Sequence, residues 1–303
     1  MKEELIVAIY CDVDEFCKAL KKYFETKGIP SNTAVKGFFS KSRMSLSEIM
    51  TIVILFHLSH YRQFKWFYIQ HVQAHLKSYF PHLVSYNRFV ELMQTALLAL
   101  TVYTMKYRVG KCTGINFIDS TKLQVCHTRR IKAHKVFKNI AARGMSSTSW
   151  FYGFKLHLII NDMGEILSFC LTPGNVDDRG RKVINHLTKN IFGKLFGDKG
   201  YLSSKLFKEL FEKGITLVTK IKKNMKNVLM DLSDKVLLKK RAMIESVNNL
   251  LKTTCQIEHS RHRSPWNFLV NLVAGLVAYS YLDTKPSLNI DRSVPKDVFL
   301  LAI

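Results

Sequence analysis

The spacing of apolar residues changes once along this chain of 303 residues, near residue 112. Before that point, apolar side chains recur at three- and four-residue intervals, which is the spacing of amphipathic helices. Ser45 followed by Glu48 forms a capping box ahead of one such run. Besides the helix that follows this box, the pattern predicts helices over about 3–27, 62–79 and 86–107. Residues 1–110 are therefore predicted to form an all-helical domain.

Beyond residue 112, short apolar runs alternate with helical patterns, as in α/β proteins. The predicted strands cover residues 113–118, 154–160, 166–171, 194–197 and 215–221, and the predicted helices cover about 179–191, 203–213, 238–252 and 266–282. A hairpin signal joins the second and third strands, and helices separate the later ones. This order is that of an RNase H-like domain, a mixed sheet flanked by helices. We assign this α/β domain to residues 111–285, followed by a tail over 286–303.

Three acids stand at corresponding places in this predicted domain. Asp119 ends the first strand, Asp198 ends the fourth, and Glu245 lies on a helix expected to return across the sheet. Each acid has an ordinary structural explanation: a turn cap, a turn residue, and an ion pair with Arg241 one helical turn away. Taken together within this element order, they predict one metal site at an edge of the sheet. Hard oxygen ligands of this kind suit Mg²⁺.

Other possible ligands are assigned to structural roles. Asp177 and Asp178 start the helix after the third strand, where an acid is expected to cap the helix. His71 and His75 have a spacing that can bind zinc, but the sequence places no third ligand near them. We expect this pair to lie on a helix surface.

The formal charge of +23 changes the functional interpretation. Residues 111–303 carry +17 of it, and such an excess predicts a polyanionic partner, with nucleic acid as the first candidate. Apolar content of 47% is typical of a globular protein. The six cysteines are scattered without a CxxC pair, which fits reduced thiols in the cytoplasm. The longest apolar stretch, Phe268–Leu282, is shorter than the roughly 20 residues that cross a bilayer, so no membrane partner is expected.

Two regions are candidates for binding DNA. The segment Lys122–Lys155 contains no acid and is predicted to be a loop that grips phosphates, although solvated charge is the usual explanation of such a segment. The helical domain over 1–110 suits a DNA-binding module, or it packs on its neighbour without binding DNA. No recognition helix stands out in the sequence, and both interpretations stay open.

Several motifs together resemble those of bacterial insertion-sequence DDE transposases. The segments are FIDST (117–121), GFKLHLIIND (153–162), TPGNVDD (172–178), GDKGY (197–201), RAMIESVNNLLK (241–252) and IEHSRHRS (257–264). They resemble the superfamily with a Tyr-x2-Arg-x3-Glu-x6-Lys motif, most closely its nine-eighty-two family. Leu238 stands where that motif has tyrosine, so a tyrosine contact to DNA is absent there.

The resemblance implies a catalytic triad of Asp119, Asp198 and Glu245. It also implies that Arg241 and Lys252 contact DNA phosphates near the scissile bond. Two Mg²⁺ ions, which Mn²⁺ is expected to replace, would support cleavage at the element ends and attack of the freed 3′-hydroxyl on target DNA. Two element ends must be joined, so a homodimer is expected on double-stranded DNA in a bacterial cytoplasm. The further expected DNA contacts are Lys122, Arg129, Arg130, Arg261 and Arg263.

Two other functional classes remain open at this point. One is an RNase H-like nuclease or resolvase that cuts DNA without joining it, which the Arg-Glu-Lys helix disfavours. The other is a non-catalytic DNA-binding protein descended from such an enzyme, which the intact set of three acids disfavours.

Overall fold

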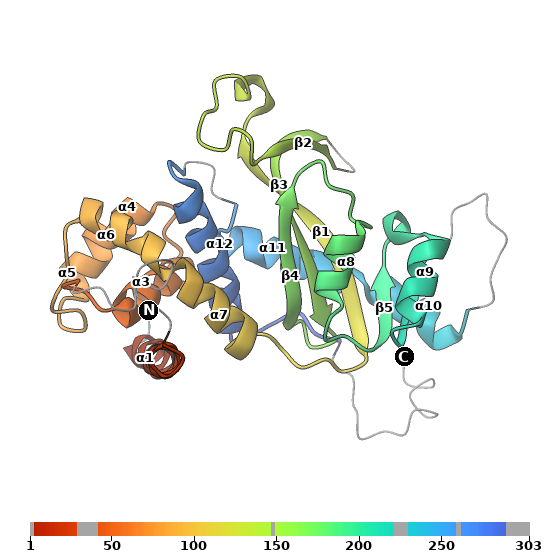
Figure 1. Ribbon diagram of the computed structural model, residues 1–303, viewed down its shortest axis with the longest axis horizontal. Coiled ribbons are helices and arrows are strands. Elements are labelled where there is room, and N and C mark those ends of the chain that lie inside the picture. Colours follow the sequence, from red (N-terminus) through yellow and green to blue (C-terminus); the bar gives the residue numbers. More distant parts are fainter. Residues whose placement is uncertain (1–2, 29–41, 147–148, 221–229, 259–261, 289–303) are drawn as a thin grey trace. The chain divides into compact units, whose positions relative to one another are not determined.

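The structure is a computed structural model that describes residues 3–28, 42–146, 149–220, 230–258 and 262–288 (Figure 1). The chain divides into two compact units. The helical unit contains Met1–Arg108 and Leu250–Leu282, and the sheet unit contains Val109–Asn249 and Asp283–Ile303. We describe each unit separately.

The helical unit is built around two buried helices, α3 and α12. Its elements are α1 (Glu3–Thr26), α3 (Leu46–Leu58), α4 (Phe64–Trp66), the π-helix η1 (Phe67–Val72), α5 (Gln73–His75), α6 (Tyr86–Met93), the 3-10 helix η2 (Gln94–Ala96), α7 (Leu97–Tyr107) and α12 (Pro265–Ser280). All residues of α3 from Ser47 to His57 are buried. The α12 helix packs against α3 and α7. It carries apolar side chains on all sides, and these are buried by contact with more than one helix.

The predicted helical pattern is largely confirmed in this unit. The capping box is present: Glu48 N–H donates to Ser45 Oγ (3.1 Å) and Ser45 N–H donates to Glu48 Oε2 (2.6 Å). The helix predicted over 62–79 differs, because it contains the π turn η1 and ends at His75. This turn accompanies complete burial of the neighbouring rings of Phe67 and Tyr68, which a regular helix would direct to different faces. The helix predicted over 86–107 is likewise interrupted, by η2.

The described residues of the sheet unit form a six-stranded mixed sheet. Its elements are β1 (Ile115–Cys126), the 3-10 helix η3 (Thr128–Arg130), β2 (Ala142–Met145), β3 (Trp150–Asn161), β4 (Ile166–Pro173), α8 (Arg181–Leu187), β5 (Gly193–Gly197), the 3-10 helix η4 (Lys199–Tyr201), α9 (Ser204–Phe211), β6 (Ile215–Thr219), α10 (Leu232–Lys240) and α11 (Ala242–Thr253), which leaves the unit after Asn249. The strand order is β2-β3-β1-β5-β6, with β4 paired to β3. The β2, β3, β1 and β4 pairings are antiparallel, and β1-β5 and β5-β6 are parallel. The prediction of a mixed sheet flanked by helices is confirmed at this level.

One face of the sheet is covered by α8 and α9 (Figure 1). Ile118 of β1 packs there with Val183 of α8 and Leu206 of α9. Because successive strand residues point to opposite faces, Asp119 is directed away from this apolar cluster.

Several details of the predicted sheet unit are wrong. Asp119 lies inside β1 and does not end it, because β1 pairs with β3 as far as Cys126. The same pairing turns both ends of the predicted loop over 122–155 into strand. The close approach of the two strands at their bulge requires Gly153, since a Cβ there would collide with the Leu123 carbonyl.

Two further predictions about helices are also wrong. The α8 helix has Gly180 at its N-cap with no side-chain cap, so Asp178 does not cap it. The helix predicted over 238–252 is divided into α10 and α11, with Arg241 between them. The predicted strand before Asp198 and the predicted helix after Ser203 are confirmed as β5 and α9.

The contact grouping departs from the predicted boundaries at the end of the chain. The prediction placed residues 111–285 in one domain, whereas Leu250–Leu282 group with the N-terminal helices. The described helices include none whose length and apolar content would let it cross a membrane.

Candidate active site

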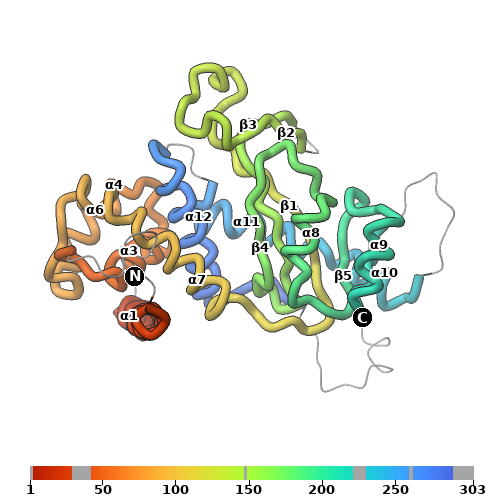
Figure 2. Tube along the Cα trace, viewed as in Figure 1, coloured from red at the N-terminus to blue at the C-terminus, as the bar shows by residue number. Residues whose placement is uncertain are grey.

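The sheet register brings two of the predicted acids to equivalent positions on adjacent strands, Asp119 within β1 and Asp198 directly after β5. β1 and β5 run parallel and side by side, with Phe117 paired to Phe196 (Figure 1, Figure 2). Asp119 and Asp198 each follow their paired phenylalanine by two residues. Parallel strands carry such equivalent positions to the same edge of a sheet. The side chain of Asp198 also caps η4, since its Oδ1 accepts from Gly200 N–H (2.9 Å).

The third acid arrives on α11, which is fastened to β1 by its own side chains. Asn248 Nδ2 donates to Asp119 Oδ2 (3.0 Å). Arg241 Nη2 donates to Glu245 Oε1 (2.6 Å), and Arg241 Nη1 lies 3.8 Å from Asp119 Oδ1. The Arg241 guanidinium is therefore between Asp119 and Glu245. Its side chain is 19% exposed, whereas that of Glu245 is 58% exposed.

The ionisation of Asp119 reflects this crowding of acids. Burial raises the pKa of Asp119 to about 6; Arg241 and the Ser120 backbone N–H oppose the rise, and Asp198 and Glu245 add to it. The single guanidinium of Arg241 does not balance the negative charges of the three carboxylates, so the charged form of Asp119 is disfavoured. The three acids thus share one electrostatic environment.

The side chains around Asp119 fit a divalent cation in their chemistry. Asp119, Asp198 and Glu245 offer hard carboxylate oxygens, the ligand type that Mg²⁺ and Mn²⁺ take. Two buried atoms near them, the Tyr201 hydroxyl and Arg241 Nη1, make no hydrogen bond with the described residues. A divalent cation would offset the shared negative charge of the acids.

The arrangement is not a preassembled ligand set. Among the residues that the structure describes, no three side chains of His, Cys, Asp or Glu lie close enough together to hold a metal ion. The Glu245 carboxylate forms an ion pair with Arg241.

The residues predicted to contact DNA have different surroundings. In the sheet unit, Arg241 lies against Asp119 and Glu245. Arg129 and Arg130 are exposed on η3, and Lys122 Nζ donates to Ser149 Oγ (3.2 Å). In the helical unit, Lys252 Nζ forms an ion pair with Glu258 Oε2 (3.0 Å), and Arg263 is exposed. Arg261 lies outside the described residues.

Two residues of this site, Asn248 and Tyr201, were not predicted from the sequence. Asn248 follows Glu245 by three positions, so helical spacing alone places it on the same face. Tyr201 lies in the GDKGY segment, and its ring packs over Gly197. A Cβ at Gly197 would lie 3.2 Å from both Ile118 Cγ2 and Tyr201 Cδ2, so glycine makes room for the ring.

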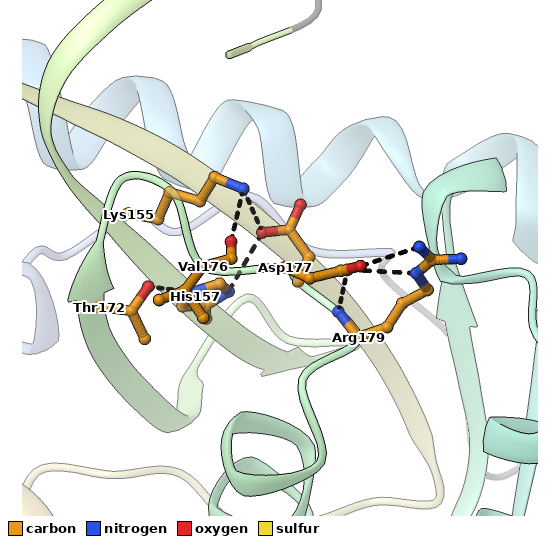
Figure 3. A network of polar contacts seen from close by, with 7 residues as sticks. Lys155, His157, Thr172, Val176, Asp177 and Arg179 are labelled. Atoms are coloured by element: carbon orange, nitrogen blue, oxygen red, sulfur yellow. Dashed lines mark hydrogen bonds and ion pairs between the residues drawn. The ribbon is translucent and has the colours of Figure 1, made fainter. Parts of the chain in front are cut away.

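The acid predicted to cap α8, Asp178, belongs instead to a polar network with Lys155 and His157 of β3, which Figure 3 shows. Lys155 Nζ donates to Asp178 Oδ1 and to Val176 O, each at 3.0 Å. His157 Nε2 is hydrogen-bonded to Thr172 Oγ1 (2.8 Å), and His157 Nδ1 lies 3.7 Å from Asp178 Oδ1. Burial lowers the pKa of His157 to about 4, against the raising effect of Asp178, so the imidazole is neutral at pH 7.

Comparisons with known proteins agree with the motifs at this site. The profile of the family described as "Transposase DDE domain" matches residues 109–265. A search of curated protein sequences finds no match. One similar solved structure is a cryo-EM structure of the piggyBac transposase synaptic complex with hairpin DNA, with a TM-score of 0.49 and 10% sequence identity. That similarity covers 90% of this chain and 71% of the other.

The family assignment therefore rests on the profile. Its match extends from before β1 to the first residue of α12 and includes all three acids. Because it covers more than half of the sequence, the chain belongs to the transposase DDE domain family.

Proposed function

We propose that this DNA transposase cleaves DNA at the ends of an insertion sequence and transfers the freed strand into target DNA, using Asp119, Asp198 and Glu245 to hold divalent cations. The observation that carries the proposal is the meeting of three distant segments. The β1-β5 register aligns the two aspartates, and Asn248 and Arg241 fasten α11 to the same edge.

We also propose that the sheet is RNase H-like. The strands β4-β3-β1-β5-β6 supply an antiparallel meander followed by parallel strands, with α8 before β5 and α9 before β6. The short strand β2 is an addition on the outer side of β3. The quoted motifs support a place in the bacterial nine-eighty-two family of insertion sequences.

The cation, Mg²⁺ with Mn²⁺ as a substitute, would activate the attacking water or hydroxyl and stabilise charge on the phosphate. Asp119 is oriented for this role by the amide of Asn248. Arg241 holds Glu245 through Nη2, while its Nη1 makes no hydrogen bond within the described structure. We propose that the Arg241 guanidinium also contacts a DNA phosphate, through the part of its side chain that is exposed (19%).

The proposed partner is double-stranded DNA, as the formal charge of +23 supports. We propose Lys122, Arg129, Arg130, Lys252, Arg261 and Arg263 as further phosphate contacts. A homodimer is proposed because two element ends must be joined in one complex, and the cytoplasm is the proposed location.

The test is a cleavage assay on DNA from the element ends, with and without Mg²⁺. Asp119→Asn, Asp198→Asn and Glu245→Gln should each lower the cleavage rate at least about a thousandfold, since a catalytic metal contributes several kcal/mol. DNA affinity should stay within about threefold, because the lost groups do not bind phosphate directly. Glu212→Gln, which removes an exposed acid at the end of α9, is the control.

Cleavage at the normal rate by any one of the three variants would remove that residue from the triad. A strand-transfer assay with a pre-cut 3′ end separates a transposase from a nuclease. Cleavage without transfer in that assay would contradict the transposase assignment.

A further inference from the structure

Two side chains of the β2-β3 hairpin, Met145 and Trp150, are exposed although both are large and apolar. Each is 53% exposed, and the two residues pair directly across the strands. The Arg143 guanidinium lies over the Trp150 indole, 4.7 Å from the ring centroid. One exposed apolar side chain is ordinary, but here an indole, a thioether and a guanidinium form one surface. We call Arg143, Met145 and Trp150 the hairpin patch.

The hairpin patch lies on the face of the sheet that carries Asp119. Asp119 pairs with Leu158 of β3, and alternate β3 side chains from Leu158 to Trp150 point to this same face. The β1-β3 bulge places its extra residue in β1, so the alternation along β3 is unbroken. The pairing of Met145 with Trp150 extends the same face to β2. Leu158 and Trp150 are at most about 27 Å apart along β3, at about 3.4 Å per residue.

The segment between β1 and β2 lies over this face and is anchored there by Phe137. The Phe137 ring meets the Phe154 ring edge-on (centroids 5.7 Å apart) and is stacked with His134 (5.5 Å). The Tyr152 hydroxyl donates to the Phe137 carbonyl (3.4 Å). Tyr152 and Phe154 alternate along β3 with the same parity as Trp150, so they share its face. The hairpin patch is therefore beside a segment that packs on the sheet.

Positive charge surrounds the hairpin patch. No Asp or Glu occurs from Ser120 to Asn161. Six exposed cations lie between the end of β1 and the start of β3: Arg129, Arg130, Lys132, Lys135, Lys138 and Arg143. An acid-free surface of this kind selects a polyanion over a protein of mixed charge. Cations beside an exposed aromatic ring are the combination that binds single-stranded nucleic acid, because the cations bind phosphates while the ring stacks on a base.

We propose that the hairpin patch binds an unpaired base of the DNA, with Trp150 stacked on that base. Arg143 covers one face of the indole, and the base takes the other. In a duplex the flat faces of a base are covered by its neighbours, so the indole can stack only on an unpaired or terminal base. The inference rests on the proposed DNA partner and goes beyond it, because it adds a base contact to the phosphate contacts.

The geometry also limits where that base lies. A DNA strand advances about 3.4 Å per base in a duplex, so about 27 Å along β3 corresponds to about eight bases. The unpaired base is therefore expected within about eight nucleotides of the phosphate at Asp119.

The test compares two DNA probes bound to the full-length chain without divalent cations, so that no cleavage occurs. One probe is a blunt duplex of about 20 base pairs, and the other is the same duplex with a 3′ overhang of about four nucleotides. In fluorescence anisotropy, Trp150→Ala should weaken binding of the overhang probe about tenfold, the loss of one stacked base. Its affinity for the blunt probe should change less than about twofold. Trp150→Phe keeps a ring and should recover most of the lost affinity.

Two further variants separate stacking from charge and from a general loss of surface. Phe192→Ala is the matched control, because it removes a 55% exposed ring directly before β5, at the opposite end of the strands. It should change neither affinity more than about twofold. Arg143→Gln should reduce the salt slope for the overhang probe by about one, whereas Trp150→Ala removes no charge and should leave the slope unchanged.

A second readout reports stacking independently of affinity. A 2-aminopurine base in the overhang loses fluorescence when it stacks on an aromatic ring. At saturating protein, the wild type should quench this base more strongly than Trp150→Ala. Thermal unfolding of each variant identifies a loss of fold, and Trp150→Phe tests the inference even if Trp150→Ala unfolds.

The outcomes separate this inference from the proposed function. If the wild type binds neither probe, the proposed DNA partner itself fails. If it binds both probes and Trp150→Ala changes neither affinity nor quenching, the hairpin patch is overturned as a base-binding site and the DNA partner stands. An equal loss for both probes would also overturn stacking on an unpaired base. A change of Trp150→Ala from dimer to monomer with unaltered DNA binding would assign the hairpin patch to a second copy of the chain instead.

Discussion

Burial acts in opposite directions on two ionisable side chains of the sheet unit. It raises the pKa of Asp119 to about 6 and lowers the pKa of His157 to about 4, because removal from water disfavours the charged form of either group. The positive charge of Arg241 partly offsets the cost of burying the Asp119 carboxylate, and a bound cation would offset the rest. The His157 ring is neutral at pH 7, and in that form it makes a hydrogen bond to Thr172 Oγ1.

The buried histidine makes stability depend on pH. The pKa of His157 lies near 4 in the folded protein and near 6.5 when unfolded, so the unfolded chain binds more protons between these values. Its contribution to stability is therefore complete above about pH 6.5 and is lost as the pH falls toward 4. The loss is at most about 1.4 kcal/mol per pH unit, and Asp178 reduces it while Lys155 adds to it.

Urea unfolding of the wild type and of His157→Gln at pH 7 and pH 5 measures this effect. The difference in unfolding free energy between the two pH values should be smaller in His157→Gln by about 1–2 kcal/mol. An identical pH dependence in both proteins would show that His157 is not the titrating group. His186→Gln, which changes an exposed histidine of α8, is the control.

At the scale of elements, the residue at a helix N-terminus decides how that helix begins. The α3 and α9 helices begin at serine caps, Ser45 and Ser203, whose hydroxyls accept from backbone N–H groups. In contrast, α8 begins at Gly180 without a side-chain cap, which leaves Asp178 to serve the network in Figure 3. Asp178 bonds to Lys155 of β3 and does not cap α8.

The capping box of α3 gives a stability prediction for the helical unit. Ser45→Ala should lower the unfolding free energy by about 1 kcal/mol, because an N–H of the first turn loses its acceptor. Thermal and urea unfolding monitored by circular dichroism would show it. A change below a few tenths of a kcal/mol would mean that water replaces the hydroxyl without cost.

Most elements were predictable from local patterns, and the exceptions involve partners distant in sequence. Apolar spacing predicted α1, the β3-β4 hairpin, β5 and α9. It missed the second half of β1, because Lys122–Cys126 is strand only through pairing with β3. It also missed the junction at Arg241, where the side chain turns to Asp119 in another segment.

At the scale of the whole molecule, charge is the property that bears on the partner. Each phosphate contact releases counterions, so the logarithm of DNA affinity should fall linearly with the logarithm of salt concentration. The formal charge of +23 predicts a steep slope for the wild type. Two cations near the site provide a matched pair for testing one contact: Arg241, beside the acids, and Lys239, exposed on α10.

Arg241→Ala should weaken DNA binding and reduce the salt slope by about one, because one phosphate contact is lost. Lys239→Ala should leave the slope nearly unchanged. Fluorescence anisotropy of labelled end DNA at several salt concentrations measures both. Equal slopes in the wild type and Arg241→Ala would assign Arg241 solely to holding Glu245.

The sequence by itself determined the helical and sheet regions, the positive charge and the three acids, because these depend on local spacing, composition and short motifs. Only the tertiary structure decided what surrounds the acids. The hydrogen bond from Asn248 to Asp119 and the place of Arg241 between two acids both depend on how α11 lies against β1. Hydrogen bonds and burial between distant segments leave no periodic signal in the sequence, so these partners emerge only when the chain is folded.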